Sequence, residues 1–256
     1  MSRPNVGIFG LTGCAGDQLV ILNCEDRFLH IIAALNIRDF AMASSDNDSA
    51  CDLDLAIVEG AVLSRRDEEQ LERIRARSRI LVAIGTCAVW GGIAAMDGDT
   101  DRSQLVRDIY GECGEQFDTT PARALHEIVG VDLNISGCPI EEEEFLSGIS
   151  NLLNGDLPIA PTTPVCAECK MREYNCLLTE RVDMCLGPLT LGGCNARCPG
   201  LSIGCVGCRG PVDDANLESV TALFMENGFG REDIARKLRT FAGLRVVAHT
   251  LSEDES

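Results

Sequence analysis

The sequence is poor in aromatic residues, in basic residues and in long apolar runs, and each shortage excludes a class of protein. Aromatic side chains make up only 4% of the 256 residues, but 45% are hydrophobic, so the chain can bury an aliphatic core. Its 22 basic residues against 40 acidic ones give a net charge of −18, which argues against nucleic acid or an anionic membrane surface as partner. No apolar run of about 18 residues predicts a membrane-spanning helix, and no basic segment followed by an apolar stretch opens the chain. We therefore expect a cytoplasmic protein.

Histidine is also scarce, whereas cysteine is abundant. His30, His126 and His249 are scattered, and none stands at ligand spacing to a cysteine. The 14 cysteines indicate metal or redox chemistry, because disulfides are rare in the cytoplasm. Cys24 and Cys51 each occur singly in or beside an apolar stretch, so these two are expected to be small core residues.

Short β-rich runs alternate with helical patterns in the first part of the chain. Strands are predicted at 5–10, 38–43, 54–60, 79–85 and 131–137, and helices at 18–36, 64–78 and 121–129. Ser64 is expected to cap its helix, and Pro139 to start a further one. This alternation predicts an α/β fold with a doubly wound parallel sheet, in which ligands bind beyond the carboxyl ends of the strands.

Residues of ligand type follow several of these predicted strands. Cys14 and Asp17 come after the first strand, Glu59 ends the third, Cys87 follows the fourth and Cys138 follows the fifth. We expect the three thiols to converge at one edge of the sheet, with Asp17 as a fourth ligand. Asp17 has a second interpretation, as an acidic residue in the first turn of a helix, where the dipole stabilises it. Glu59 is alternatively a cap or a satisfied polar group.

A proline-rich segment at 156–164 predicts a linker, with one domain at 1–158 and a second at 159–256. The second domain begins with a cysteine-rich block that has little regular pattern. Its tail predicts helices at 214–227 and 231–243 and an extended segment at 245–251.

The cysteine-rich block contains eight cysteines separated by gaps of 2, 6, 8, 8, 3, 6 and 2 residues. This nearly palindromic spacing divides into two groups of four. The first group is Cys166, Cys169, Cys176 and Cys185, and the second is Cys194, Cys198, Cys205 and Cys208. Cys198 is followed by proline, like the last ligand of bacterial ferredoxin motifs.

Two kinds of four-thiolate site fit this block. Structural zinc sites would use the same ligands. Iron–sulfur clusters are favoured, because zinc ribbons usually serve nucleic-acid or protein contacts and the block has few basic and almost no aromatic residues. Sequential grouping and a ferredoxin-like crossing, in which one cysteine of each run serves the other cluster, both stay open.

Four segments of the chain resemble the small subunit of nickel–iron hydrogenases. They are GCAGD near residue 14, GTCAVWGG at 85–92, GCP at 137–139 and the block CLGPLTLGGCNARCPGLSIGCVGC, which is similar to that of the cytoplasmic multi-subunit branch. The resemblance covers nearly the whole chain and keeps the order of the motifs. It implies a flavodoxin-like domain with a proximal four-iron cluster, then a small irregular ferredoxin-like two-cluster domain with C-terminal helices.

The resemblance also implies a ligand set for three 4Fe–4S clusters. The proximal cluster would be held by Cys14, Asp17, Cys87 and Cys138. The distal cluster would be held by Cys166, Cys169, Cys176 and Cys185, and the medial cluster by Cys194, Cys198, Cys205 and Cys208. Most members have cysteine where this chain has Asp17, and that departure resembles the coenzyme F420-reducing hydrogenases of methanogens. No residue of the chain is expected to act as a catalytic acid or base.

By this resemblance the chain would be one subunit of coenzyme F420 hydrogenase, an enzyme of methanogenesis. It would conduct electrons from a large subunit with the nickel–iron centre to a flavin subunit that holds FAD and reduces coenzyme F420. A permanent interface in a higher-order hetero-oligomer is expected. The alternatives are a small subunit of a heterodisulfide-reductase-linked or sulfhydrogenase-type hydrogenase, or a zinc-stapled interaction protein.

Overall fold

The protein, described by a computed structural model, forms two compact units, Met1–Ile135 and Ser136–Ser256. The structure describes residues 3–24, 29, 33–96, 101–156, 158 and 160–244. His30, His249 and the predicted segment 245–251 lie outside the described residues. No helix among the described residues is long and apolar enough to cross a membrane.

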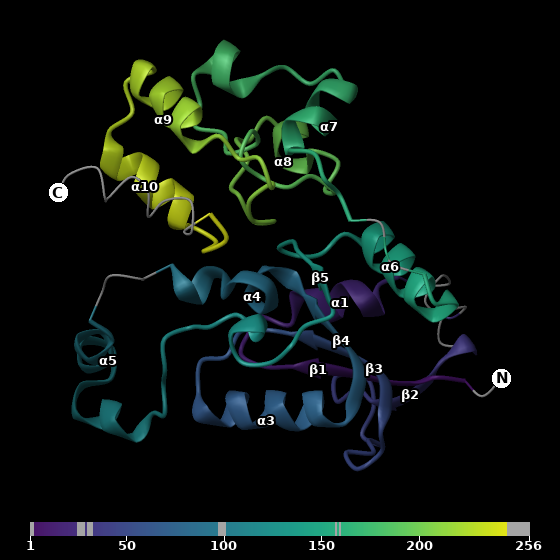
Figure 1. The fold of residues 1–256 in the computed structure, drawn as a ribbon. Coiled ribbons are helices and arrows are strands. Elements are labelled where there is room, and N and C mark those ends of the chain that lie inside the picture. The colour runs from purple at the N-terminus through teal and green to yellow at the C-terminus, as the bar shows by residue number, and fades with distance from the viewer. Residues whose placement is uncertain are drawn as a thin grey trace. The chain divides into compact units, whose positions relative to one another are not determined.

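A parallel sheet of five strands forms the first unit (Figure 1). The strands are β1 (Asn5–Gly10), β2 (Asn36–Asp39), β3 (Leu53–Glu59), β4 (Ser78–Ile84) and β5 (Leu133–Ile135). Their order is β2-β1-β3-β4-β5, and every neighbouring pair is parallel. This is the flavodoxin-like order, so the predicted fold class is confirmed.

One face of the sheet is covered by α3 (Arg65–Ala76), as Figure 1 shows. Leu71 and Ile74 of this helix join a buried core with strand residues such as Val58 and Leu81. The helix starts as predicted, because the Ser64 hydroxyl accepts a hydrogen bond of 3.1 Å from the Asp67 N–H. Of the two cysteines expected in the core, Cys24 is buried and Cys51 is half-buried against this core.

The other helical elements of the first unit follow the strand ends or lie in the segment before β5. Among the described residues they are α1 (Gly16–Leu22), α4 (Gly85–Trp90), η1 (Gly92–Ala95), α5 (Arg102–Tyr110), η2 (Gly111–Gln116) and η3 (Leu125–Glu127). The helix predicted over 121–129 is wrong, since only η3 forms there. Arg123 is instead held in extended backbone by paired hydrogen bonds with Val62.

Two more predicted boundaries are shifted. The second strand ends at Asp39, because Phe40 accepts the backbone hydrogen bonds of a turn from Ala43 and Ser44. The helix predicted from Pro139 begins at Glu142.

The second unit consists of short helices joined by long loops. Its helical elements are α6 (Glu142–Asn154), α7 (Val165–Met171), η4 (Leu177–Arg181), α8 (Arg197–Gly200), α9 (Leu217–Glu226) and α10 (Arg231–Arg239). The helices α9 and α10 confirm the predicted helical tail. Their apolar residues Phe224 and Leu238 join a buried core with Leu186, Leu189 and the cysteine Cys205.

The division between the units comes earlier than the linker at 156–164 suggests. Arg209, from the end of the cysteine-rich block, donates hydrogen bonds to the Ser136 carbonyl and, at 2.8 Å, to Glu144 of α6. A further ion pair of 2.6 Å joins Arg197 to Glu141. These contacts attach the start of α6 to the cysteine-rich segment, so residues from Ser136 onward belong to the second unit.

Candidate metal centres

Cysteine and acidic residues lie beyond the carboxyl ends of β1, β3 and β4, as the sequence predicts. Cys14 follows β1, Glu59 ends β3, and Cys87 lies in α4, which begins directly after β4. Because these strands are parallel neighbours, their carboxyl ends share one edge of the sheet. That edge therefore carries two of the predicted thiol ligands.

Asp17 is buried in the first turn of α1, with 6% of its surface exposed. Its backbone N–H donates to Glu59 Oε1 at 3.3 Å, and Gln18 Nε2 donates to Glu59 Oε2 at 2.7 Å. Glu59 is thus a buried, hydrogen-bonded carboxylate. A Cβ on Gly85 would stand 1.8 Å from Asp17 Oδ2, so the Asp17 carboxylate lies against the start of α4. This position agrees with both interpretations of Asp17.

The Cys87 thiol has the other two predicted ligands of the first unit beside it. Burial, followed by the charges of Asp17 and Cys14, raises the pKa of Cys87 to about 11, although a hydrogen bond from the Ile93 backbone opposes this. A Cβ on Gly92 would lie 2.5 Å from Cys87 Sγ, so glycine leaves space around the sulfur. Three of the four predicted proximal ligands are therefore neighbours.

Cys138, the fourth predicted proximal ligand, is exposed and belongs to the second unit. It follows β5 by three positions and lies beside Cys208. Burial raises the pKa of Cys208, a hydrogen bond from the Cys138 backbone opposes that rise, and the charge of the Cys138 thiol adds to it. The convergence of Cys138 with Cys14 and Cys87 stays a prediction.

The first four cysteines of the cysteine-rich block are neighbours in the structure. Burial, followed by the charges of Cys185, Cys169 and Cys176, raises the pKa of Cys166 to about 12. A Cβ on Gly187 would lie 3.3 Å from Cys166 Sγ and 3.5 Å from Cys185 Sγ, so this glycine borders a space between two of the sulfurs.

Cys176 differs from the other thiols of this group. Burial raises its pKa, but hydrogen bonds from the Thr179 side chain and from the backbones of Thr179 and Leu178 outweigh burial, so the pKa lies below its usual value. These donors stabilise the thiolate, which is the form that binds metals.

The last four cysteines form a second set of neighbours. Burial raises the pKa of Cys208 to about 11, and the nearby charges that add to it are those of Cys194, Cys138 and Cys198. Burial also raises the pKa of Cys205 to about 12, with contributions from Cys185 and Cys208. The Cys205 N–H donates to Cys185 Sγ at 3.2 Å, so a backbone hydrogen bond links the two sets.

These donor sets fit iron–sulfur clusters in chemistry and in space. In the part of the chain that the structure describes, no three histidine, cysteine or acidic side chains are arranged to hold a single metal ion. A four-iron cluster instead takes one thiolate on each iron, so its ligands surround a volume. Gly92 lies beside the Cys87 sulfur, and Gly187 lies beside the sulfurs of Cys166 and Cys185. A Cβ at either glycine would occupy space next to these sulfurs. Metal binding displaces the thiol proton into solvent, so thiols whose pKa is raised by burial can still become thiolate ligands.

Two charged side chains of the second unit contact the segments that carry predicted ligands, and no sequence pattern predicts these contacts. Glu168 accepts backbone hydrogen bonds from Gly193 and Ala196, on both sides of Cys194. Arg209 is 1% exposed and binds the backbone of two segments that carry predicted ligands. Each is adjacent to a cysteine in the sequence, but nothing in a single sequence signals that these charges are directed at the backbone.

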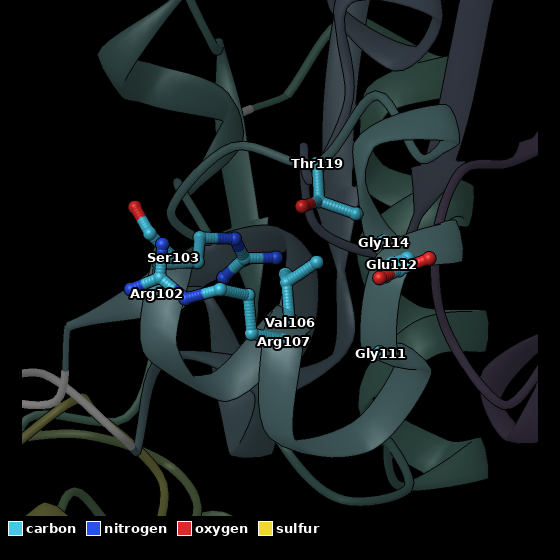
Figure 2. Close-up of a pocket in the computed structure, with 8 residues that line it drawn as sticks. All are labelled: Arg102, Ser103, Val106, Arg107, Gly111, Glu112, Gly114 and Thr119. Carbon is cyan, nitrogen blue, oxygen red and sulfur yellow. The ribbon is translucent and has the colours of Figure 1, made fainter.

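A cavity of about 980 Å³ along α5 and η2 has a different character (Figure 2). It is lined by Arg102, Ser103, Val106, Arg107, Gly111, Glu112, Gly114 and Thr119. None of these is a predicted ligand, so the cavity is no part of the candidate metal centres.

Known proteins are similar to this chain in sequence and in fold. Residues 14–152 match the family described as NADH ubiquinone oxidoreductase, 20 Kd subunit. The chain is 39% identical to sulfhydrogenase 2 subunit delta of Pyrococcus furiosus, over 93% of this chain and 98% of that protein. It is 29% identical to one subunit of the F420-non-reducing hydrogenase vhu of Methanocaldococcus jannaschii, over 81% of this chain and 82% of that protein. A crystal structure of an NAD+-reducing NiFe hydrogenase in the H2-reduced state matches with 25% identity and a TM-score of 0.55, over 62% of this chain and 96% of that one.

Proposed function

From the premise that this chain belongs to the NADH ubiquinone oxidoreductase 20 Kd subunit family and is the electron-transfer small subunit of a nickel–iron hydrogenase, we propose that it conducts electrons through three 4Fe–4S clusters. The acceptor system we propose is of the sulfhydrogenase type. The observation that carries the proposal is that the C-terminal cysteines are neighbouring thiols: Cys166 lies beside Cys169, Cys176 and Cys185, and Cys208 lies beside Cys194 and Cys198.

The two sets correspond to the sequential grouping. Cys166 has the charges of Cys169, Cys176 and Cys185 beside it, which supports their assignment to the distal cluster. Cys208 has Cys194 and Cys198 beside it, which supports the medial assignment of these three. We assign Cys205 to the second set by its place in the sequence, and its thiol lies near both Cys208 and Cys185 of the first set. The thiol charges around Cys166 all come from its own run, which supports sequential grouping, whereas the contact of Cys205 with Cys185 keeps the ferredoxin-like crossing as the alternative.

The proximal cluster would be held by Cys14, Asp17, Cys87 and Cys138. Cys14, Asp17 and Cys87 are close enough to interact electrostatically, which supports this part of the set. The buried pair Gln18 and Glu59 holds the backbone of Asp17 in place.

Bound clusters would supply one-electron transfer, a chemistry that no side chain of this protein provides. The chain's own residues bind, orient and shield them. The thiols fix each cluster, backbone N–H groups donate to the sulfurs of Cys14 and Cys185, and the apolar core of the second unit excludes water. The partners we propose are a large subunit with the nickel–iron centre and a flavin-containing subunit, in a hetero-oligomer of the cytoplasm.

The comparisons favour the sulfhydrogenase alternative over the coenzyme F420 interpretation. The sulfhydrogenase relative is matched over nearly all of both chains, and the hydrogenase of Methanocaldococcus jannaschii is named as F420-non-reducing. Asp17 by itself therefore does not identify the acceptor.

Metal analysis of the chain, purified without oxygen in its complex, tests the cluster proposal. We expect about twelve irons per chain, four for each of three clusters, and a matching amount of acid-labile sulfide. Two zinc ions without iron would overturn the proposal and support the zinc-stapled alternative.

The acceptor is tested separately with the same complex. Hydrogen-dependent reduction is measured with polysulfide, with NAD+ and with coenzyme F420, and with a viologen dye as the control for an active complex. We expect reduction of polysulfide. An active complex that reduces only coenzyme F420 would overturn the sulfhydrogenase assignment without affecting the cluster proposal.

A further inference from the structure

The loop at 192–196, which carries Cys194, has a backbone that needs external support. Gly193, Asn195 and Ala196 have φ angles of 111°, 56° and 51°, all in the left-handed region. Such angles cost free energy for residues other than glycine and persist only where surrounding contacts hold them. The position of the Cys194 sulfur therefore depends on what holds this loop.

Glu168 of α7 holds the loop from one side. Its Oε1 accepts a hydrogen bond of 2.6 Å from the Gly193 N–H, and its Oε2 accepts one of 3.0 Å from the Ala196 N–H. The two bonds bracket Cys194, whose Sγ lies 4.0 Å from Glu168 Oε2. Charge-assisted bonds of this kind are stronger than bonds between neutral groups.

Arg209 holds the same loop at its start. Its Nε donates to the Gly192 carbonyl at 2.6 Å. A Cβ on Gly193 would come within 2.5 Å of Arg209 Nη2, so glycine is needed for this approach. The guanidinium also donates from Nη1 to the Ser136 carbonyl and from Nη2, at 2.8 Å, to Glu144 Oε1.

The groups that Arg209 connects are each within two residues of a predicted ligand in the sequence. Gly192 is two residues before Cys194, Ser136 is two residues before Cys138, and Arg209 directly follows Cys208. One buried side chain thus connects three segments that each present a predicted cluster ligand. A guanidinium has five N–H donors in a rigid planar fork, which lets Arg209 reach three separate partners at once. Because Arg209 is buried, removing its charged partner Glu144 would leave an uncompensated positive charge and destabilise the fold.

We propose that Arg209 and Glu168 are positioning residues that clamp the Cys194 loop, and that Arg209 sets the spacing between the segments that carry Cys138 and Cys194. This inference rests on the proposed function, in which these cysteines bind successive clusters. Outer hydrogen bonds and charges of this kind orient ligands and tune the potential of a metal site. The carboxylate on one side of Cys194 and the guanidinium on the other act on that potential in opposite directions.

The test uses the intact complex, purified without oxygen, with Glu168→Gln as the first variant. Glutamine keeps the shape and one acceptor oxygen, so we expect the iron content to be unchanged. Loss of the negative charge favours the reduced cluster, so one midpoint potential should move in the positive direction in an EPR-monitored titration. Glu218→Gln, an exposed change on α9, is the matched control and should leave all potentials unchanged.

Arg209→Met and Arg209→Lys test the second half of the clamp. Methionine removes the charge and the donors, so iron should fall from about twelve toward about eight per chain, which is the loss of one four-iron cluster. Lysine keeps the charge and some of the contacts and should restore part of that iron, with a broadened EPR signal. Arg231→Met, an exposed change on α10, is the control.

The outcomes separate this inference from the proposed function. Zinc without iron in the unmodified complex would overturn both. A normal iron content in that complex, with every Glu168 and Arg209 variant matching its control in iron, EPR spectrum and midpoint potentials, would overturn the clamp alone. If Arg209→Met does not fold, Glu168→Gln still decides the question through the midpoint potential.

Discussion

At the scale of single residues, Asp17 is the position where two physical roles compete. A carboxylate in the first turn of a helix gains about 0.3–1 kcal/mol from the dipole when it is exposed. Asp17 is buried, however, and α1 has only seven residues. A buried carboxylate loses its hydration and needs strong compensation. Cys14 and Cys87 lie beside it. A cation bound by these two cysteines and Asp17 would add to that compensation.

Substitution of Asp17 distinguishes the two roles. With a ligand role, Asp17→Ala should weaken or convert the proximal cluster, and Asp17→Cys should retain four irons there with a shifted potential, because thiolate is a softer ligand than carboxylate. EPR spectra and iron analysis of the complex measure both effects. An unchanged proximal signal in Asp17→Ala would show that Asp17 is only a first-turn residue.

The candidate ligands were predictable from sequence to the extent that they follow strand ends or repeat at fixed gaps. Cys14 and Cys87 were found because a parallel sheet gathers the residues that follow its strands. Glu168 and Arg209 were not, because their roles depend on burial and on backbone groups distant in the chain. The sequence shows that these two residues are charged, but no pattern in it predicts which backbone groups they bind.

At the scale of elements, the sequence predicts a helix or strand well where its apolar residues are all buried in a regular pattern. The strands β1, β3 and β4 are apolar on both faces, and α3 has a stripe that meets the core, so these were placed to within a residue or two. The helix α5 was not predicted; Leu105, Val106 and Ile109 stand at helical spacing, but none of its residues is buried in the first unit. Residues 121–129 have a helical pattern, but pairing of Arg123 with Val62 overrides it.

The start of α3 provides a prediction at this scale. Ser64→Ala removes the acceptor of the Asp67 N–H and should destabilise the first unit by about 1 kcal/mol. In a chain of this size that corresponds to a fall of roughly 3 °C in the melting temperature of the complex, followed by circular dichroism. Ser103→Ala, an exposed change on α5, is the control. Equal melting temperatures in the two variants would contradict the capping role.

At the scale of the whole molecule, the two units depend on different sources of stability. The first unit has a five-stranded sheet and a core between that sheet and α3. The core of the second unit includes Cys185 and Cys205, and most of the backbone around them is loop. Loops without regular hydrogen bonding open at low free-energy cost unless something else ties them. Under the proposed function, metal–thiolate bonds tie these loops, and their binding free energy becomes folding free energy.

Removal of the clusters should therefore loosen the second unit selectively. The complex is treated with an iron chelator and an oxidant, then digested briefly with a protease, and the fragments are identified by mass spectrometry. We expect early cleavage within 160–210, where the thiols lie in loops, while fragments of the β-sheet unit persist, because that unit keeps its own core. The untreated complex, digested in parallel, should resist cleavage in both regions. First cleavage within the strands β1, β3 or β4 would contradict this division, because it would mean that the sheet also depends on the bound iron.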